Sequence, residues 1–351
     1  MAKITEALTR FPLFHHKGWQ TAVRYVLMIL FASLMFGVIL LIAGKDPLAS
    51  YKDILSSTLG SASGFSEVIV SMIPMLITAL AVALPFRVGL INIGGEGQLF
   101  IGAAFATFAA LTFPNLPGWL LLPLMALLGM VGGALWAFIP GYLKSIGLVN
   151  ETITSLLLNS VAPKIIGFLI LGFWHSARDT VKTPSFVDAA RLPTFFGTRI
   201  HLGLVLGLVL LVIFWYLMKY TRWGLEMRAI GSNPQAARRN GIPVSKYMVV
   251  VMCMGGAIAG LAGMVQVSGF YGMLFPNFSM NMGFMGFMIC WLAGADPLGI
   301  ILMAFVVSII YSGGNLLQLT RGLPYSVINI LLAFTLFIVL ARPNFSKRKK
   351  S

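Results

Sequence analysis

The sequence predicts an all-α integral membrane protein, on the evidence of its composition and the pattern of its apolar residues. Of its 351 residues, 58% are hydrophobic and only 10% are charged, and the mean hydropathy is +0.90. In a soluble domain roughly a quarter of all residues are charged, and they help to cover its core. The apolar runs are continuous rather than alternating. They therefore favour helices over a closed barrel, the other structure that satisfies every backbone group in lipid.

Windows of about 20 residues, the length that crosses a bilayer core, predict about ten transmembrane helices between residues 25 and 341. The first span follows Arg10, Lys17 and Arg24 and has no A-x-A cleavage site, so we expect an anchor rather than a removable signal. The third, eighth and ninth spans have only about 15 residues, which makes them tilted, re-entrant or wrongly bounded. The ten spans are expected at 25–43, 68–86, 99–113, 118–143, 152–173, 202–218, 247–270, 281–295, 297–311 and 322–341.

The Lys and Arg residues predict the orientation of these spans. With the N-terminus inside, seventeen of the 25 basic residues lie in cytoplasmic segments and seven in external ones, as the positive-inside rule requires. The prediction is a single N-in, C-in membrane domain, and this distribution explains the net charge of +15 without a nucleic-acid partner. Its cytoplasmic parts are 1–24, the loop 219–246 and the basic tail 342–351. The largest external loop, 174–200, is either a solvated connector or a docking surface.

The cytoplasmic loop contains a short helix whose two ends can be read from the sequence GSNPQAARRNGIP (231–243). Asn233 is a good N-cap and Pro234 suits the first helical position. Gly241 can adopt the left-handed conformation that ends a helix. The sequence therefore predicts a helix at 234–240.

A helix this short is marginal in water, so another surface must pack against it. Ala236 and Ala237 allow a close approach, and Arg238 carries positive charge toward an acidic or groove-shaped partner. The alternative is an amphipathic turn that rests on anionic lipid headgroups.

The segment NIGGEGQ (92–98) lies between two apolar runs and contains three glycines. Consecutive glycines disfavour a continuous helix by about 1 kcal/mol each relative to alanine. Helices broken within a membrane mark cavities in which backbone groups meet a solute. The candidate pathway residues are Asn92, Glu96 and Gln98. The alternative is an interfacial turn beside Arg87, with Glu96 solvated in the cytoplasm.

Polar residues also begin the fifth predicted span. Asn159 follows Glu151 by eight residues, so the two share a helical face about 12 Å apart, with Asn150 just before them. Such a polar stripe faces the interior of a helix bundle. These residues either line the pathway or form hydrogen bonds between helices, which is the commoner role of Asn in membranes.

Three motifs resemble those of one transporter superfamily. LEMRAIGSNPQAARRNGI (225–242) resembles the coupling-helix loop of ABC permeases in the ribose and branched-chain amino-acid importer superfamily. VGLINIGGEGQLFIGA (88–103) and VNETITSLLLN (149–159) are similar to the branch associated with nucleoside uptake and nucleoside-binding lipoproteins. The likeness runs from the second predicted span to the tail.

The resemblance implies the permease subunit of an ATP-binding-cassette importer in the bacterial cytoplasmic membrane, with a nucleoside as the favoured solute and a simple sugar next. It also implies a nucleotide-binding ATPase, a second permease subunit that is a paralogue, and an extracytoplasmic solute-binding lipoprotein. In that setting the short helix is a coupling helix, which presses residues 233–238 into a groove of the ATPase. The sequence has no G-x-x-x-x-G-K-[ST] motif, so we expect no cofactor on this chain and ATP with Mg²⁺ on the partner.

Two other classes compete with this interpretation. An ion-coupled secondary transporter would also lack an ATP motif, but it needs carboxylates or histidines deep in its spans, whereas Glu96 and Glu151 are expected near span ends. A membrane-embedded enzyme needs paired acids, a metal-binding group or a nucleophile beside a base. The four histidines are scattered over loops and span ends, so an enzyme is not expected.

Overall fold

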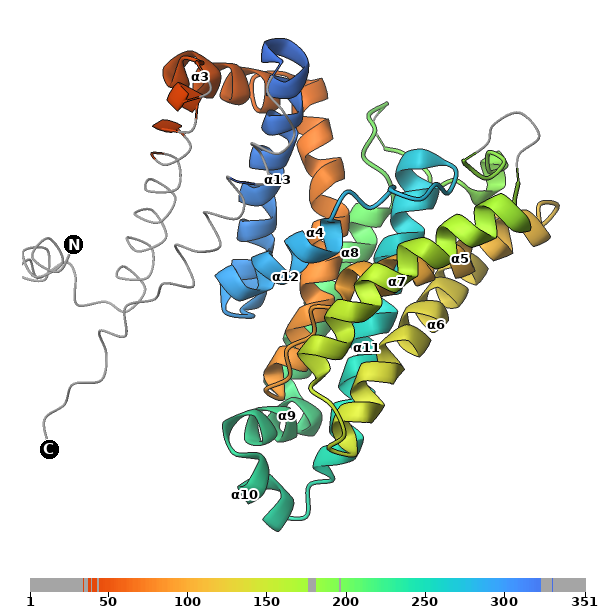
Figure 1. The fold of residues 1–351 in the computed structure, drawn as a ribbon, viewed down its shortest axis with the longest axis vertical. Coiled ribbons are helices and arrows are strands. Elements are labelled where there is room, and N and C mark those ends of the chain that lie inside the picture. The colour runs from red at the N-terminus through yellow and green to blue at the C-terminus, as the bar shows by residue number, and fades with distance from the viewer. Residues whose placement is uncertain are drawn as a thin grey trace, which may run out of the picture. The chain divides into compact units, whose positions relative to one another are not determined.

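The computed structural model of the chain describes residues 34, 37, 38, 40–42, 44–175, 181–195, 197–322 and 330. The described part is helical, with a single isolated bridge between Thr194 and His201 outside the helices (Figure 1). Its helices are α3 (Pro47–Thr58), α4 (Ala62–Arg87), α5 (Gly95–Thr112), α6 (Gly118–Ser145), α7 (Glu151–Gly172), η2 (Asp188–Ala190), α8 (Gly203–Tyr220), α9 (Arg222–Ser232), α10 (Pro234–Arg239), α11 (Val244–Val265), η3 (Gln266–Tyr271), α12 (Met282–Ala293) and α13 (Pro297–Arg321).

The chain divides into two compact units, Met1–Ser57 with Gly313–Ser351, and Thr58–Ser312. Within the first unit, α3 packs against the last turns of α13, where a Cβ atom on Gly313 would lie 2.5 Å from Cγ2 of Ile54. The second unit contains α4 to α12 and the first turns of α13. It also contains all the candidate site residues.

Six helices in the described part are long and apolar enough to cross a membrane: α4, α6, α7, α8, α11 with η3, and α13. Each overlaps a predicted span, which confirms the all-helical membrane class. The total of about ten spans and the N-in, C-in orientation stay predictions. Most of the expected spans 25–43 and 322–341 lies outside the described residues, and the segment 1–24 and the tail 342–351 lie outside them entirely.

The three short predicted spans have different outcomes. The ninth, 297–311, was wrongly bounded, because α13 continues to Arg321 and has 25 residues. The third corresponds to α5, which has 18 residues like α8 but begins with the polar turn 95–98, so its apolar stretch is shorter. The eighth corresponds to α12, which has only 12 residues. Helix α12 ends where Gly294 and Ala295 adopt φ values of +62° and +57°.

Helices α5 and α12 are short because both begin inside the bundle, with their N-termini together. A Cβ atom on Gly283, in the first turn of α12, would lie 2.3 Å from the backbone nitrogen of Glu96 in the first turn of α5. From this junction α12 runs to the end of the bundle that carries α9 and α10, here called the α10 end. Helix α5 runs to the opposite end, here called the η2 end (Figure 1).

The segment α4–α5–α6 and the segment α11–α12–α13 have the same order of elements. Each has a long helix, a return into the bundle, a short helix and a second long helix, and the return after α11 also contains η3. The short helices α5 and α12 run in opposite directions (Figure 1). Inverted repeats of this kind, with broken helices at their interface, are a recurring architecture of transporters.

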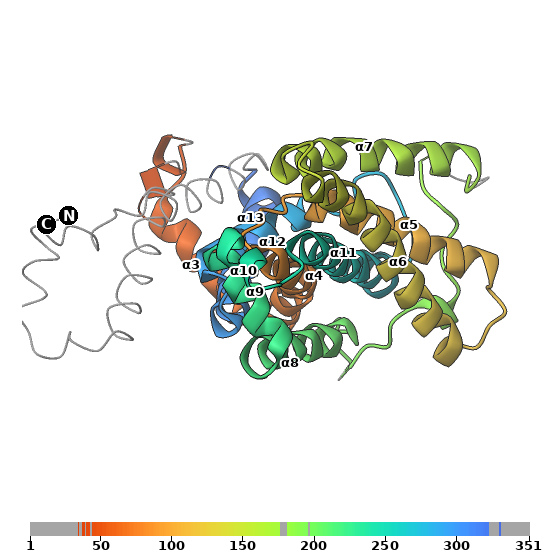
Figure 2. The ribbon, with the colours of Figure 1, turned by 90° about the horizontal axis from the view of Figure 1, so that it is seen from below.

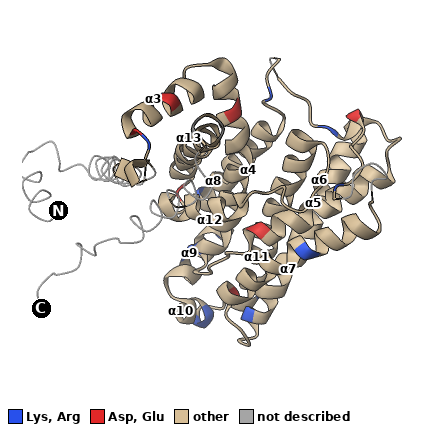
Figure 3. Cartoon of the chain, turned by 45° about the horizontal axis from the view of Figure 1, so that its top comes forward, with Lys and Arg blue, Asp and Glu red and all other residues tan. Residues whose placement is uncertain are grey.

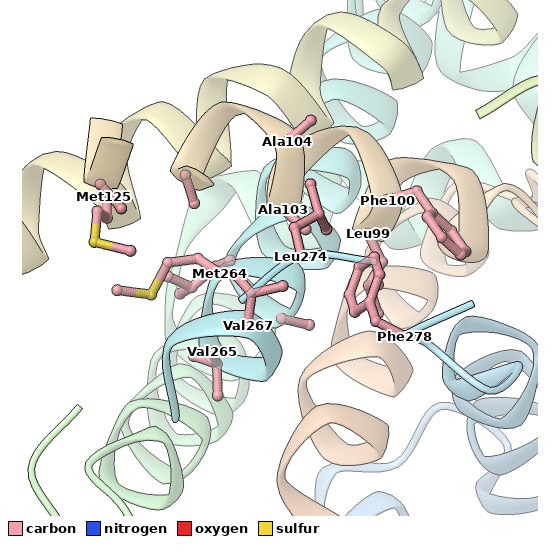
Figure 4. Packing of buried hydrophobic residues seen from close by; sticks show 14 of the residues in the cluster. Leu99, Phe100, Ala103, Ala104, Met125, Met264, Val265, Val267, Leu274 and Phe278 are labelled. Atoms are coloured by element: carbon pink, nitrogen blue, oxygen red, sulfur yellow. The ribbon is translucent and has the colours of Figure 1, made fainter. Parts of the chain in front are cut away.

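Glycines bring α5, α6 and α11 into backbone contact. A Cβ atom on Gly260 of α11 would lie 2.1 Å from the carbonyl oxygen of Gly129 in α6, and one on Gly102 of α5 would lie 2.2 Å from the Cα atom of Gly260. Small residues allow this close packing in membranes, where apolar side chains gain little by leaving lipid. Around this contact, the apolar cluster in Figure 4 joins side chains of α5, α6, α11 and the segment after η3.

We expect Gly260→Val to reduce the yield of folded protein strongly, because the new side chain meets backbone atoms of α6 that cannot rotate away. The cost of such overpacking is about 3 kcal/mol or more. The measurement is the monodisperse fraction in size-exclusion chromatography after detergent extraction. Gly167→Val on α7 is the control, since nothing lies within 4 Å of a Cβ atom there. Equal yields for the two variants would contradict the packing argument.

Candidate functional site

Between α4 and α5 the chain returns into the bundle as a non-helical segment, residues 88–94, here called the extended segment, which turns at Val88 and Gly89 and again at Gly94. Its backbone runs along the first half of α7. The Ile91 amide donates to Oε1 of Glu151 at 3.4 Å, and two residues later the Ile93 carbonyl accepts from Nδ2 of Asn159 at 2.8 Å. The buried face of α7 therefore supplies hydrogen-bond partners that a strand would normally find in a sheet.

A pair of side-chain amides closes the end of this segment. Nδ2 of Asn92 donates to Oε1 of Gln98 at 3.1 Å, and Nε2 of Gln98 donates to Oδ1 of Asn92 at 3.0 Å. The same Asn92 oxygen accepts from the Gly94 amide at 2.9 Å. Both side chains are buried. Together they fix the turn from which α5 starts.

The carboxylate of Glu96 lies at the junction of α5 and α12. Its Oε2 accepts a hydrogen bond from the Gly283 amide at 2.7 Å, and its residue exposure is only 5%. A helix N-terminus stabilises a negative charge, because its first amides have no partner within the helix. The alternative that Glu96 is solvated in a cytoplasmic turn is therefore wrong.

The start of α7 separates the three polar residues that the sequence grouped there. Asn150 is exposed and caps the helix by accepting from the Thr152 amide at 2.8 Å. Glu151 is buried and forms an ion pair of 2.7 Å with Lys144 at the end of α6. Asn159 is buried against α5, where its Oδ1 accepts from the Gly97 amide at 2.8 Å. Of these three, Glu151 and Asn159 contact the extended segment.

At the α10 end, the predicted caps are confirmed. The Asn233 side chain accepts from the backbone amides of Gln235 and Ala236 at 3.1 and 3.0 Å, and Pro234 begins the helix. Gly241 has a φ of +81°. The helix ends at Arg239, one residue earlier than predicted.

The two alanines of α10 are not equivalent. Ala237 is 4% exposed, because α10 packs against α9 and α11 of the same chain, and Figure 2 shows α10 beside α9. Ala236 and Arg238 are exposed. The sequence analysis assigned both alanines to contact with a partner, but Ala237 is covered by helices of this chain. What remains outside is a surface of Gln235, Ala236, Arg238 and Arg239.

Sequence reasoning missed α9, which supports α10. Its Met227 and Ile230 are fully buried, and Glu226 accepts a hydrogen bond from the hydroxyl of Tyr247 in α11. Two features of the sequence could have predicted α9. Met227 and Ile230 are three residues apart, as on one face of a helix, and Thr221 is a good N-cap, which its side chain is in the structure.

Comparison with known proteins identifies the family. Residues 64–340 match the family model described as branched-chain amino acid transport system / permease component. This chain belongs to that family. It is a permease of ABC importers, and the permease is a transport component rather than an enzyme.

Three curated relatives resemble the permease over most of their length. A glucose ABC transporter permease protein of Haloferax volcanii is 33% identical, over 92% of this chain and 88% of the relative. The nucleoside ABC transporter permease protein NupB of Lactococcus lactis is 30% identical over 90% of each chain. The guanosine ABC transporter permease protein NupP of Bacillus subtilis is 31% identical, over 86% of this chain and 88% of the relative.

Among solved structures, the permease resembles PsaBC from Streptococcus pneumoniae in complex with Fab. The TM-score is 0.50 and the sequence identity is 13%, over 84% of this chain and 96% of that chain. At this identity the likeness concerns the fold alone.

Basic side chains of the permease gather at the α10 end, as Figure 3 shows for α10. At the end of α8, Nζ of Lys219 lies 5.3 Å from the ring centres of both Trp215 and Tyr220. Aromatic and basic residues in this arrangement are typical of a membrane–water interface. The α10 end is therefore expected at one surface of the bilayer.

At the η2 end, the loop before α8 contains a buried histidine. His201 is 2% exposed, and its Nδ1 accepts from the Gly203 amide at 3.2 Å. Burial lowers the pKa of His201 to about 4, because desolvation disfavours the charged imidazolium. The imidazole is therefore neutral near pH 7.

We expect Asn159→Leu to lower the thermal stability of the permease. The substitution keeps the side-chain volume but leaves the Gly97 amide and the Ile93 carbonyl buried without a partner, at about 1–3 kcal/mol each. The measurement is the unfolding temperature in detergent. Ser160→Leu, at the exposed next position, serves as the control. If Asn159→Leu melts at the wild-type temperature, the extended segment does not depend on this amide.

Proposed function

We propose that this permease forms the translocation path of an ATP-driven importer in the bacterial cytoplasmic membrane, and that its solute is a nucleoside. The observation that carries the proposal is the similarity to nucleoside and guanosine permeases over nearly the whole chain. A simple sugar is the next candidate, because a glucose permease is similarly related.

The ATPase partner docks at the exposed surface of α10, and ATP with Mg²⁺ binds to that partner. Two observations support this docking site. Asn233 and Gly241 fix the two ends of α10, and α9 and α11 pack beneath it at Ala237. Because the helix is already packed on this chain, a force on its outer face moves α9 with it. Arg238 and Arg239 supply positive charge for an acidic groove.

The solute passes beside the junction of α5 and α12. In this proposal Glu96 is the pathway residue at the junction itself, where the N-termini of α5 and α12 meet. Asn92, Gln98, Glu151 and Asn159 shape the path by holding the extended segment 88–94, and the exposed cap Asn150 sets the start of α7. Binding energy for a polar solute can then come from backbone groups around a broken helix.

A second permease subunit, a paralogue of this chain, covers the outer face of α7. Lys164 is exposed on that face, about 20 Å along the helix from Glu151, between exposed Val161 and Phe168. An ammonium group facing lipid there costs roughly 3 kcal/mol. Its Cα–Cβ bond also tilts toward the helix N-terminus, away from the nearer end of α7. A neighbouring subunit or a shared aqueous path removes this cost.

The loop 174–200 faces the outside and receives a solute-binding lipoprotein. Its described part is more than a solvated connector, because the Phe186 amide donates to the Gly272 carbonyl at 2.7 Å and the Thr183 amide to the Leu274 carbonyl at 3.0 Å. These contacts hold the loop over the segment that leads into α12. In this orientation the α10 end, with its basic residues, is cytoplasmic.

An ion-coupled secondary transporter is the second candidate, and one observation favours it. Glu96 lies deep in the bundle, where such transporters place their coupling carboxylates. Its hydrogen bond to the α12 N-terminus gives it another role, however, and the family membership favours ATP-driven import.

Uptake by proteoliposomes containing the complete importer, co-expressed from the neighbouring genes, distinguishes these candidates. We expect accumulation of radiolabelled guanosine that requires ATP on the side of α10 and persists when ionophores collapse the ion gradients. Excess unlabelled nucleoside should abolish it, whereas excess glucose should not. Competition by glucose alone would replace the proposed solute, and ionophore-sensitive, ATP-independent uptake would replace the proposed mechanism.

Two neighbouring substitutions on α10 test the coupling helix. Ala236→Trp enlarges the exposed surface, so we expect normal insertion and melting temperature but at least about tenfold weaker co-purification of the ATPase, as for loss of a central interface contact. Ala237→Trp enlarges the buried face and should instead lower the melting temperature of the permease itself. Normal ATPase docking and uptake by Ala236→Trp would leave α10 as a segment that only contacts headgroups.

A further inference from the structure

Helix α12 is held at both ends by polar side chains of the α4–α5 segment. At its N-terminus the Gly283 amide donates to Oε2 of Glu96. Beyond its C-terminus, Nη2 of Arg87 donates to the Ala295 carbonyl at 2.5 Å. The Arg87 guanidinium group complements the helix dipole at the C-terminal end, and Glu96 accepts from one of the amides that have no partner within the helix at the N-terminal end. With 12 residues, α12 spans about 18 Å between these two contacts.

Arg87 also contacts the segment that supports α10. A Cβ atom on Gly231, near the end of α9, would lie 2.3 Å from the Arg87 carbonyl oxygen. The backbones of α4 and α9 are therefore in direct contact at this residue. Its guanidinium group lies 5.9 Å from the ring centre of Phe214 in α8. Arg87 thus touches α9 through its backbone and α12 through its side chain.

We propose that Arg87 is a positioning residue that transmits displacement of α9 and α10 to α12, and through α12 to its junction with Glu96. A movement of α9 shifts the Arg87 backbone, and the guanidinium group moves the C-terminal end of α12. Because α12 is a single short helix, its N-terminus moves with it. The role of this relay in transport rests on the proposed function, whereas the mechanical coupling is a property of this chain alone.

The competing role for Arg87 is that of a basic anchor at the membrane surface, as the positive-inside rule describes. An anchor interacts with water and headgroups, and it need not influence a site about 18 Å away along α12. The relay instead requires that a change at Gly231 reach residues 279–286 only while the Arg87 guanidinium is present. A double-mutant cycle measures this dependence.

The test is hydrogen–deuterium exchange of the full-length permease in lipid nanodiscs, read at peptides covering 279–286. Gly231→Ala pushes α9 away from α4, and we expect exchange at 279–286 to become about tenfold faster, as for a weakened charge-assisted hydrogen bond. Arg87→Met should produce a similar increase by itself. In the double variant Gly231→Ala should add nothing further. Arg87→Gln replaces Arg87→Met in the cycle if the latter does not insert.

Arg222→Met is the matched control, since it removes an exposed positive charge from the same helix, α9. It should leave exchange at 279–286 unchanged and should not alter the effect of Gly231→Ala. Additive effects of Gly231→Ala and Arg87→Met would overturn the proposal, and so would exchange changes confined to residues 292–297. Because no transport is measured, a wrong solute or a wrong energy source would not affect this result.

Discussion

The whole arrangement depends on one constraint, that an extended backbone inside a membrane bundle must find hydrogen-bond partners within the protein. Residues 88–94 meet it with side chains, chiefly Glu151 and Asn159 from α7. With these partners in place, the chain can leave α4, turn back and begin α5 within the bundle. Without them the two short helices could not meet at their N-termini, and the Glu96 carboxylate would have no helix to cap.

Close packing of the long helices makes room for this irregular segment. Gly129 of α6 and Gly260 of α11 bring two helix backbones into contact, and Gly102 brings α5 against them. Buried polar side chains lie instead before and at the start of α5 and along α7, where Asn92, Glu96, Gln98, Glu151 and Asn159 are found. The glycine contacts hold α5, α6 and α11 in place. The hydrogen-bonded polar segment beside them carries groups that are able to bind a solute.

Features set by neighbouring residues could be predicted from the sequence, and features set by distant contacts could not. The caps at Asn233 and Gly241 and the break before α5 at Gly94 depend on local backbone chemistry, and the structure has all three. The burial of Ala237 depends on α9 and α11, so nothing local distinguished it from Ala236. The ninth span was placed too short at 297–311, although α13 continues through Asn315 and Gln318 to Arg321.

The contact between Glu96 and Gly283 joins residues separated by 187 positions in the chain. During synthesis from the N-terminus, at about 5–20 residues per second, Glu96 leaves the ribosome roughly ten seconds or more before its partner exists. The Asn159 amide reaches the extended segment much earlier, since it is only 66 positions from Ile93. The first half of the permease is therefore made before the helix N-terminus that binds the Glu96 carboxyl group, and the junction of α5 and α12 forms only after α12 is made.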